Sequence, residues 1–386
     1  MFDLVDNERD LLAVVEQLGD EPSYAVDTEF HRERTYYPKV ALVQLAFADR
    51  LVIIDPLAVD IAPLADVFAG DGMAVLHAAA QDLEVFERSC GVVPGTIFDT
   101  QIAAGFLGLS SPSLASLHER ELGKRLPKGD RLTDWLRRPL SEQQLDYAIS
   151  DVADLLQIRD RLQSDLEALD RLAWAMDECE LLRQRIRVPP DPADAWARIK
   201  ECRHLRGPAL GVAQRLAAWR EERAAETDQP ARFVLPDLAL VGIAQRKPTT
   251  VDGLKKVRGL DGRHLRSGVA DEILAVVQQG LVTKPRRLPA PRRRELDSRL
   301  RPAVPLVAAW VNQLARDAQI DPALVGTRAD IEALLRGDDD ARLTLGWRAE
   351  LVGRPIDDLL TGRASLAFEP DHGLIIEPRV LPPRPE

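Results

Sequence analysis

Two carboxylates, Asp27 and Glu29, lie two residues apart at the end of an apolar run, residues 24–30 (YAVDTEF). Successive side chains of a β-strand point to opposite faces, so both acids would lie on one face of a strand. Buried carboxylates repel each other and lose hydration, and they are stable together when a hard divalent cation lies between them. The pair therefore indicates a metal site, although two solvated acids at a strand end would give the same pattern.

A third acid, Asp82, lies where a helix is expected to begin, directly after a short apolar run that ends at His77. In open α/β sheets, sites form at the carboxyl ends of strands, which favours a functional position. An acid in the first turn of a helix is also stabilised by the helix dipole, and Asp82 taken alone fits that explanation better. Asp99 follows the next strand in the same way and is predicted to be a helix N-cap.

Tyr147 and Asp151 are predicted to lie on one helix, which begins at a capping box formed by Ser141 and Gln144. The two residues are one turn apart and face the same way. The apolar stripe that would pack on the sheet lies on the opposite side and comprises Leu145, Ala148, Ile149, Val152, Leu155 and Leu156. Taken alone, this pattern favours a surface helix.

The elements that must position these residues predict a mixed, five-stranded sheet. The short connection at residues 48–50 predicts an antiparallel meander for the first three strands, and alternation with helices predicts parallel pairing for the others. The first twenty residues read as a capped helix. The expected strands span residues 23–30, 40–47, 51–54, 73–77 and 96–98, and the expected helices span about 61–68, 81–89 and 99–107.

Composition limits the class of protein. A chain of 386 residues with 45% apolar and 29% charged residues is typical of a soluble protein with two or three domains. It contains no apolar run long enough to span a membrane, and its acidic amino terminus is unlike a signal peptide. The three scattered cysteines indicate a reducing, cytoplasmic location and argue against a zinc site or disulfide framework.

The net charge of −11 argues against a nucleic-acid partner for the chain as a whole, so any such contact must depend on local clusters. A basic loop precedes the Tyr147 helix, a basic segment lies in the helical second half, and a Pro/Arg-rich linker follows. Such clusters are the expected footprint for a nucleic-acid backbone, although the loop could also be a solvated surface. The clusters comprise Lys124, Arg125, Lys128 and Arg131; Arg246, Lys247, Lys255, Lys256, Arg258, Arg263 and Arg266; and Lys284, Arg286, Arg287, Arg292, Arg293 and Arg294.

Taken together and in this order, the three acidic groups resemble the exonuclease motifs of the DEDD superfamily, in its tyrosine-bearing branch, and in particular the ribonuclease D family. Asp154 and the run 128–130 (KGD) depart from the usual family pattern without touching a predicted metal ligand. Further stretches that carry the resemblance are residues 26–30 (VDTEF), 40–47 with Gln44, 77–86, 97–101 (IFDTQ), 133–140 (TDWLRRPL) and 147–152 (YAISDV).

The resemblance implies a ribonuclease H-like exonuclease that uses two divalent ions, Mg²⁺ or Mn²⁺. Asp27 would bridge both ions, Glu29 and Asp151 would complete one, and Asp82 would hold the other chiefly through water. Tyr147 would orient the nucleophilic water. The implied activity is 3′–5′ exoribonuclease cleavage that releases nucleoside 5′-monophosphates from tRNA precursors or other structured RNA. A single-stranded DNA exonuclease of the same fold and a non-catalytic nucleic-acid-binding scaffold remain alternatives.

The helical second half resembles the HRDC module, once over residues 205–282 and again, more weakly, over 298–365. We expect RNA as the partner, no membrane contact and a monomer. The expected division is an exonuclease domain at 1–170, a helical segment and linker at 171–204, the HRDC domain at 205–282, a basic linker at 283–297, a second HRDC-like domain at 298–365 and a C-terminal tail at 366–386, of which residues 378–386 are expected to be disordered.

Overall fold

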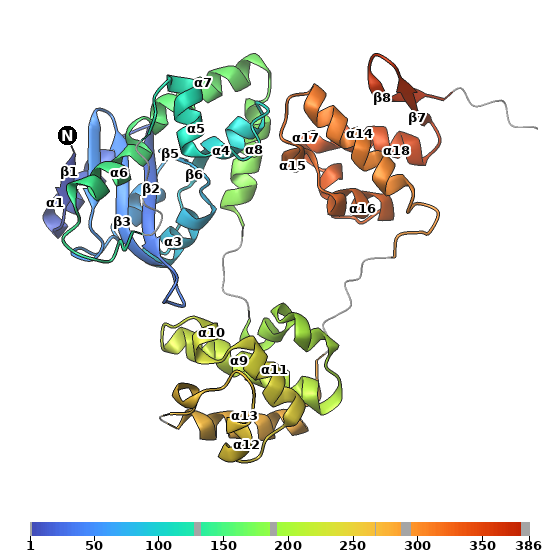
Figure 1. Cartoon of the computed structure of the whole chain (residues 1–386). Helices are drawn as coiled ribbons and strands as arrows, with labels where there is room; N and C mark the ends of the chain where they lie inside the picture. The colour runs from blue at the N-terminus through green and yellow to red at the C-terminus, as the bar shows by residue number, and fades with distance from the viewer. Residues whose placement is uncertain (1, 127–132, 186–190, 267, 287–294, 380–386) are drawn as a thin grey trace, which may run out of the picture.

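The computed structural model describes residues 2–126, 133–185, 191–266, 268–286 and 295–379. Its amino-terminal lobe is built on a six-stranded sheet with the strand order β1-β4-β3-β2-β5-β6 (Figure 1). The strands are β1 (Asp3–Val5), β2 (Ser23–His31), β3 (Lys39–Phe47), β4 (Arg50–Ile54), β5 (Met73–Leu76) and β6 (Thr96–Asp99).

The sheet is mixed, as predicted. Strands β2, β3 and β4 form an antiparallel meander, whereas β5 pairs in parallel with both β2 and β6. The prediction of five strands is wrong by one, because β1 adds a parallel partner to β4. With only three residues, β1 is too short to show a period of two, and the helix expected over the first twenty residues begins only after the N-cap Asn7.

Two layers of helices cover the sheet. One face packs on α1 (Glu8–Gly19), α2 (Leu64–Phe68) and α3 (Ala80–Cys90), and the buried residues Tyr24 and Val26 of β2 belong to this core. The other face packs on α4 (Thr100–Gly105), α6 (Glu142–Ala153) and α7 (Leu155–Ala168), and Ala25 belongs to that core. Alternate side chains of β2 therefore point to opposite helical layers, and the odd-numbered residues, which include Asp27 and Glu29, face α6.

The second lobe is helical and forms around the long helix α9 (Gly207–Glu226), which packs on α13 (Val269–Val282). A Cβ atom at Gly211 would lie 2.5 Å from the carbonyl oxygen of Gly280, so these two glycines allow the helix backbones to approach closely. The lobe also contains α10 (Ala231–Val234), α11 (Asp237–Arg246), α12 (Val251–Lys255) and the 3₁₀ turns η2 (Pro192–Arg198), η3 (Lys200–His204) and η4 (Gly262–Leu265).

The third lobe combines helices with a hairpin that the sequence did not predict. Its helices are α14 (Ala303–Asp317), α15 (Pro322–Val325), α16 (Arg328–Arg336), α17 (Gly346–Arg348) and α18 (Arg354–Leu360), with η5 (Arg342–Thr344) and η6 (Ala349–Gly353) between them. Strands β7 (Ala364–Glu369) and β8 (Gly373–Pro378) pair in antiparallel orientation, so residues 366–378 of the expected tail belong to a hairpin. Of the stretch 378–386 that was expected to be disordered, residues 380–386 lie outside the described residues. The amide of Gln313 on α14 donates to the carbonyl oxygens of His372 and Leu374, which fixes the hairpin to the lobe.

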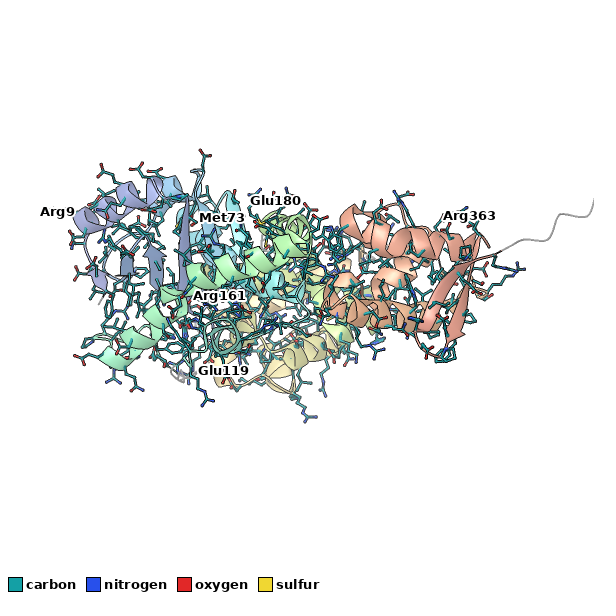
Figure 2. All side chains as sticks on the ribbon, turned by 90° about the horizontal axis from the view of Figure 1, so that it is seen from above. Arg9, Met73, Glu119, Arg161, Glu180 and Arg363 are labelled. Atoms are coloured by element: carbon teal, nitrogen blue, oxygen red, sulfur yellow. The ribbon has the colours of Figure 1, made fainter. Side chains whose placement is uncertain are left out.

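The third lobe packs against α8 (Leu172–Arg183) of the first lobe. The Trp174 ring on α8 stacks on Trp347 with 5.2 Å between centroids. The buried carboxylate of Glu178 forms ion pairs with Arg348 and, at 3.1 Å, with Arg342. Figure 2 shows this lobe lying beside α8, on which Glu180 is labelled. The third lobe is therefore held to the amino-terminal lobe by a buried aromatic and ionic contact.

The second lobe contacts the connection between β2 and β3. The Tyr36 hydroxyl donates to Glu221 on α9 at 2.8 Å, and the backbone N–H groups of Tyr36 and Tyr37 donate to Asp228 at 3.1 and 3.2 Å. In the part of the chain that the structure describes, no helix is long and apolar enough to cross a membrane.

Candidate active site

Strand β2 presents two acids to the layer that contains α6. Asp27 pairs with Gln44 and Glu29 pairs with Leu42 on the antiparallel neighbour β3. Because the two acids are two residues apart, their side chains leave the strand on the same face, as predicted.

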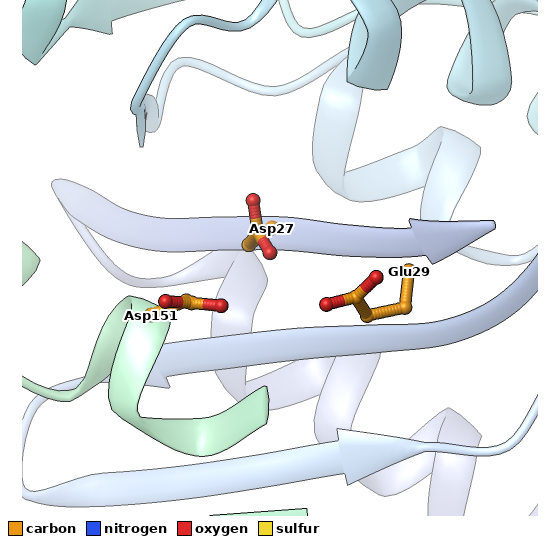
Figure 3. Close-up of side chains that lie close together, drawn as sticks. All are labelled: Asp27, Glu29 and Asp151. Carbon is orange, nitrogen blue, oxygen red and sulfur yellow. The ribbon is translucent and has the colours of Figure 1, made fainter. Parts of the chain in front are cut away.

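Helix α6 brings the third acid to this face. Ser141 caps the helix through the predicted capping box, with Gln144 as its partner. The helix buries Ala148, Ile149 and Val152 and packs on β2, β3 and β4. One carboxylate oxygen from each of Asp27, Glu29 and Asp151 lies within 4.8 Å of the others (Figure 3). Packing of the apolar side of α6 on the sheet thus places Asp151 opposite the β2 acids.

Burial and mutual repulsion perturb these carboxylates. Burial raises the pKa of Asp27 well above its usual range, and the negative charges of the other three site acids raise it further. Burial, followed by the charges of Asp151 and Asp82, raises the pKa of Glu29 to about 8. Burial raises the pKa of Asp151 to about 7. Each acid is therefore costly to ionise without a compensating positive charge.

This donor set fits a divalent cation. Among the described residues, no lysine or arginine forms an ion pair with Asp27, Glu29 or Asp151. All the donors are oxygen atoms, which suit Mg²⁺ or Mn²⁺ better than Zn²⁺. The cluster therefore fits a divalent cation by its chemistry as well as by its spacing.

Asp82 approaches Asp27 from α3, on the side of β2 where the pairing with β5 has ended at Ala25. It lies in the first turn of α3, is 6% exposed, and accepts a hydrogen bond from the Thr28 hydroxyl at 2.5 Å. Thr28 lies between the two β2 acids in sequence and points to the opposite face. Burial raises the pKa of Asp82 to about 7, and its charge has the largest charge effect on the pKa of Asp27. Asp82 is thus near Asp27, but its oxygens are not among the three that gather most closely.

Tyr147 lies half-buried on α6 and stacks on Trp135, with 6.1 Å between ring centroids. The segment that carries Trp135 is anchored by Arg138, whose guanidinium donates to Asp55 at 2.6 and 2.7 Å and to the Ala41 carbonyl at 2.8 Å. The sequence assigned no separate role to Trp135, because a ring contact across twelve residues leaves no periodic signal. These contacts fix both the phenol and the start of α6.

Asp99 and His77 have structural roles. Asp99 is the predicted N-cap of α4 and accepts from the N–H groups of Gln101 and Ile102. It also accepts from the N–H group of Ala79, one residue before α3 begins, at 2.8 Å. His77 shares a hydrogen bond with Thr100 at 3.0 Å. Asp99 therefore ties together the starts of two helices, one of which carries Asp82.

The structure describes some of the basic residues that are predicted to contact nucleic acid, whereas others lie outside the described part of the chain. Lys124 pairs with Asp154 at 2.7 Å and Arg125 pairs with Glu119 at 3.2 Å, whereas Lys128 and Arg131 lie outside the described residues. In the second lobe, Lys247 is half-buried at the end of α11. Lys255, Lys256 and Arg258 are exposed around the end of α12, and Lys255 pairs with Asp252 at 3.0 Å.

Two family models match the chain. Residues 2–167 match a 3′–5′ exonuclease domain, and residues 209–277 match an HRDC domain. The second match covers the region where an HRDC module was expected, and residues 298–365 as a further copy remain a prediction. An exonuclease domain of this family depends on divalent metal ions, in agreement with the acid cluster.

Whole-chain comparisons give the family. Ribonuclease D of Nitrobacter hamburgensis is 35% identical over 374 residues, covering 95% of this chain and 97% of the relative. Ribonuclease D of Sphingobium indicum is 34% identical over 374 residues, covering 95% of this chain and 96% of the relative. The crystal structure of Escherichia coli RNase D, described as an exoribonuclease involved in structured RNA processing, is 33% identical, with a TM-score of 0.82 and coverage of 94% of this chain and 99% of that one. The chain therefore belongs to the ribonuclease D family of 3′–5′ exoribonucleases.

Proposed function

We propose that the chain removes nucleotides from RNA 3′ ends at a site formed by Asp27, Glu29, Asp82, Asp151 and Tyr147. The observation that supports this site most is the gathering of three half-buried carboxylates with no paired cation among the described residues. A hydrolase that releases nucleoside 5′-monophosphates uses such a cluster to act on a phosphodiester.

We propose two metal ions, Mg²⁺ or Mn²⁺, for this site. Asp27, Glu29 and Asp151 would hold one ion, and Asp27 and Asp82 would hold the other, with Asp82 acting chiefly through water. Bound divalent ions would neutralise charge on the attacking and leaving oxygens of the phosphodiester.

The proposed role of Tyr147 is to position the attacking water molecule. Its hydroxyl can hydrogen-bond to a water molecule and hold that water in line with the scissile bond. The stack on Trp135 restricts rotation of the phenol, because a large ring covers one of its faces. Tyr147 therefore acts in this proposal by orientation, one helical turn from the Asp151 carboxylate.

For the substrate we propose tRNA precursors or other structured RNA, bound by a monomer in the cytoplasm. The similarity to E. coli RNase D, an exoribonuclease involved in structured RNA processing, supports structured RNA as the substrate class. The exposed Lys256 and Arg258 of the second lobe would contact the phosphate backbone, as would the basic loop that contains Lys124. The three free cysteines support a reducing compartment.

Degradation of a 5′-labelled single-stranded RNA tests the proposal, with Mg²⁺, with Mn²⁺ and with EDTA. We expect a ladder that shortens from the 3′ end and disappears with EDTA. A DNA oligomer of the same sequence, assayed beside it, measures the preference for ribose, and faster cleavage of the DNA would favour the alternative DNA exonuclease. Intact RNA binding without cleavage in any metal would instead identify a binding scaffold.

A further inference from the structure

Gln44, in the middle of β3, is a buried polar residue with no hydrogen-bond partner. Its side chain is 0% exposed, and among the described residues neither its amide nitrogen nor its amide oxygen has a partner. Buried amides nearly always form hydrogen bonds, because an unmade bond leaves the cost of desolvation uncompensated. Gln44 therefore calls for a functional explanation.

The register of the sheet shows where this amide lies. Gln44 stands directly opposite Asp27 on β2 and opposite Ile53 on β4. Directly opposed residues of an antiparallel pair project from the same face, about 4.5–5.5 Å apart at Cβ. Gln44 thus shares the face of the acid cluster, within side-chain reach of the Asp27 carboxylate.

Apart from Asp27, the strand neighbours of Gln44 on this face are apolar. Ile53 flanks it on β4, and α6 covers the same core with Ala148, Ile149 and Val152. In the row of directly opposed residues Asp27, Gln44 and Ile53, Asp27 is the polar residue to which the Gln44 amide can donate a hydrogen bond.

Asp27 in turn lacks a fixed side-chain partner. Within the described residues, no side chain donates a hydrogen bond to its carboxylate, whereas the Asp82 carboxylate accepts one from Thr28. Carboxylates that bind metal ions are generally held by hydrogen bonds from further residues. A neutral amide suits this task, because a lysine or arginine in its place would compete with the cation.

Building on the proposed function, we propose that Gln44 is a positioning residue for Asp27. Its Nε2–H group donates a hydrogen bond to the Asp27 carboxylate when that carboxylate holds a metal ion. The amide thereby sets the orientation of the acid that the resemblance assigns to both ions, without contacting substrate.

Gln44→Leu tests this role in the full chain. The variant removes both unpartnered polar atoms and keeps a similar side-chain volume. If Gln44 had only a structural role, the melting temperature would be unchanged or higher and metal binding would be unchanged. We expect the dissociation constant for Mn²⁺, measured by calorimetry without RNA, to rise by about 10- to 100-fold. We also expect a lower kcat on a short RNA with little change in KM, and partial recovery at high Mn²⁺ concentration.

Two further variants control for misfolding and for the loss of a buried glutamine in general. Gln44→Met repeats it with an unbranched apolar side chain in case leucine disturbs folding. Gln214→Leu is the matched control, because Gln214 is a buried glutamine that bonds to the Arg286 backbone in the second lobe, and its loss should leave Mn²⁺ affinity unchanged.

Unchanged Mn²⁺ affinity and kcat in both Gln44 variants would overturn the inference. Asp27→Asn separates this failure from failure of the proposed function. If Asp27→Asn abolishes metal binding while the Gln44 variants do not, only the role of Gln44 is wrong. If Asp27→Asn retains metal binding and cleavage, the proposed site itself is wrong.

Discussion

In the proposed site, protons and metal ions would compete for the same oxygens of the acid cluster. Burial and the neighbouring carboxylates raise the pKa of Glu29 to about 8, and burial raises the pKa of Asp151 to about 7. An acid must lose its proton before it holds a cation, so binding of a divalent ion at the proposed site would release protons.

The first prediction concerns pH. Because these pKa values are raised, the folded protein without metal binds more protons than the unfolded chain between about pH 4 and about pH 8. Its free energy of unfolding should therefore fall as the pH rises through this window, and Mn²⁺ should restore most stability at the upper end. Thermal unfolding with EDTA or with Mn²⁺ across this window checks the sign. Equal stabilisation by Mn²⁺ at both ends would contradict it.

The second prediction concerns the hydrogen bond from Thr28 to Asp82. Thr28→Val keeps the shape of the side chain but removes the donor to a buried carboxylate. Without metal, the free energy of unfolding should fall by about 1–3 kcal/mol, the usual cost of leaving a buried polar group unpaired. Thr28→Ser, which keeps the hydroxyl, should lose much less. Chemical denaturation in EDTA compares the three proteins, and equal losses in valine and serine variants would argue against the hydrogen bond.

At the scale of elements, α6 sets the geometry of the site, because it carries both Asp151 and Tyr147. Arg138 anchors the segment before it by bonding to Asp55 and to the Ala41 carbonyl. The segment just before the helix is thus fixed by contacts to β3 and to the residue that follows β4.

The third prediction tests this anchor. Arg138→Gln should lower the free energy of unfolding by about 1–3 kcal/mol, because a half-buried Asp55 loses a charged donor. It should also lower kcat although no acid of the cluster is changed. Arg137→Gln is a suitable control, since the neighbouring arginine makes no ion pair among the described residues. Normal kcat in Arg138→Gln would show that α6 is positioned without this anchor.

The sequence predicted the elements with strong periodicity and the residues that belong to short motifs. The meander, the crossover helices, the capping box at Ser141 and the pairing of Asp27 with Glu29 on one face are all local patterns. Strand β1 was not predicted because three residues show no period, and the residues of the β7–β8 hairpin were assigned to the end of the second HRDC-like domain and to the C-terminal tail. The stack of Trp135 on Tyr147 and the unpartnered amide of Gln44 depend on tertiary packing, which no local pattern encodes.

For the whole molecule, the contact between the first and third lobes depends on one buried carboxylate. Glu178 lies on α8 and accepts from the Trp347 indole at 3.2 Å, in addition to its ion pairs with Arg348 and Arg342. Arg348 is 3% exposed, so it relies on Glu178 to balance its charge.

The fourth prediction concerns this contact. Glu178→Ala leaves the Arg348 guanidinium without its partner and should cost about 3–5 kcal/mol, which favours separation of the lobes. Small-angle scattering should show a larger radius of gyration. Glu180→Ala is the matched control two residues away, because Glu180, labelled in Figure 2, is more exposed and pairs with Arg183 on its own helix. Identical scattering from wild type and Glu178→Ala would contradict the prediction.

The most direct test of the proposed catalytic centre is Mn²⁺ binding and RNA cleavage measured on one preparation of Asp151→Asn. This variant removes one charge from the three carboxylates that meet between β2 and α6 while leaving both elements intact. We predict that Mn²⁺ binding weakens and cleavage falls by more than about 100-fold, since even residues that only support metal ligands contribute 10- to 100-fold. Cleavage and Mn²⁺ affinity equal to those of the wild type would contradict the account.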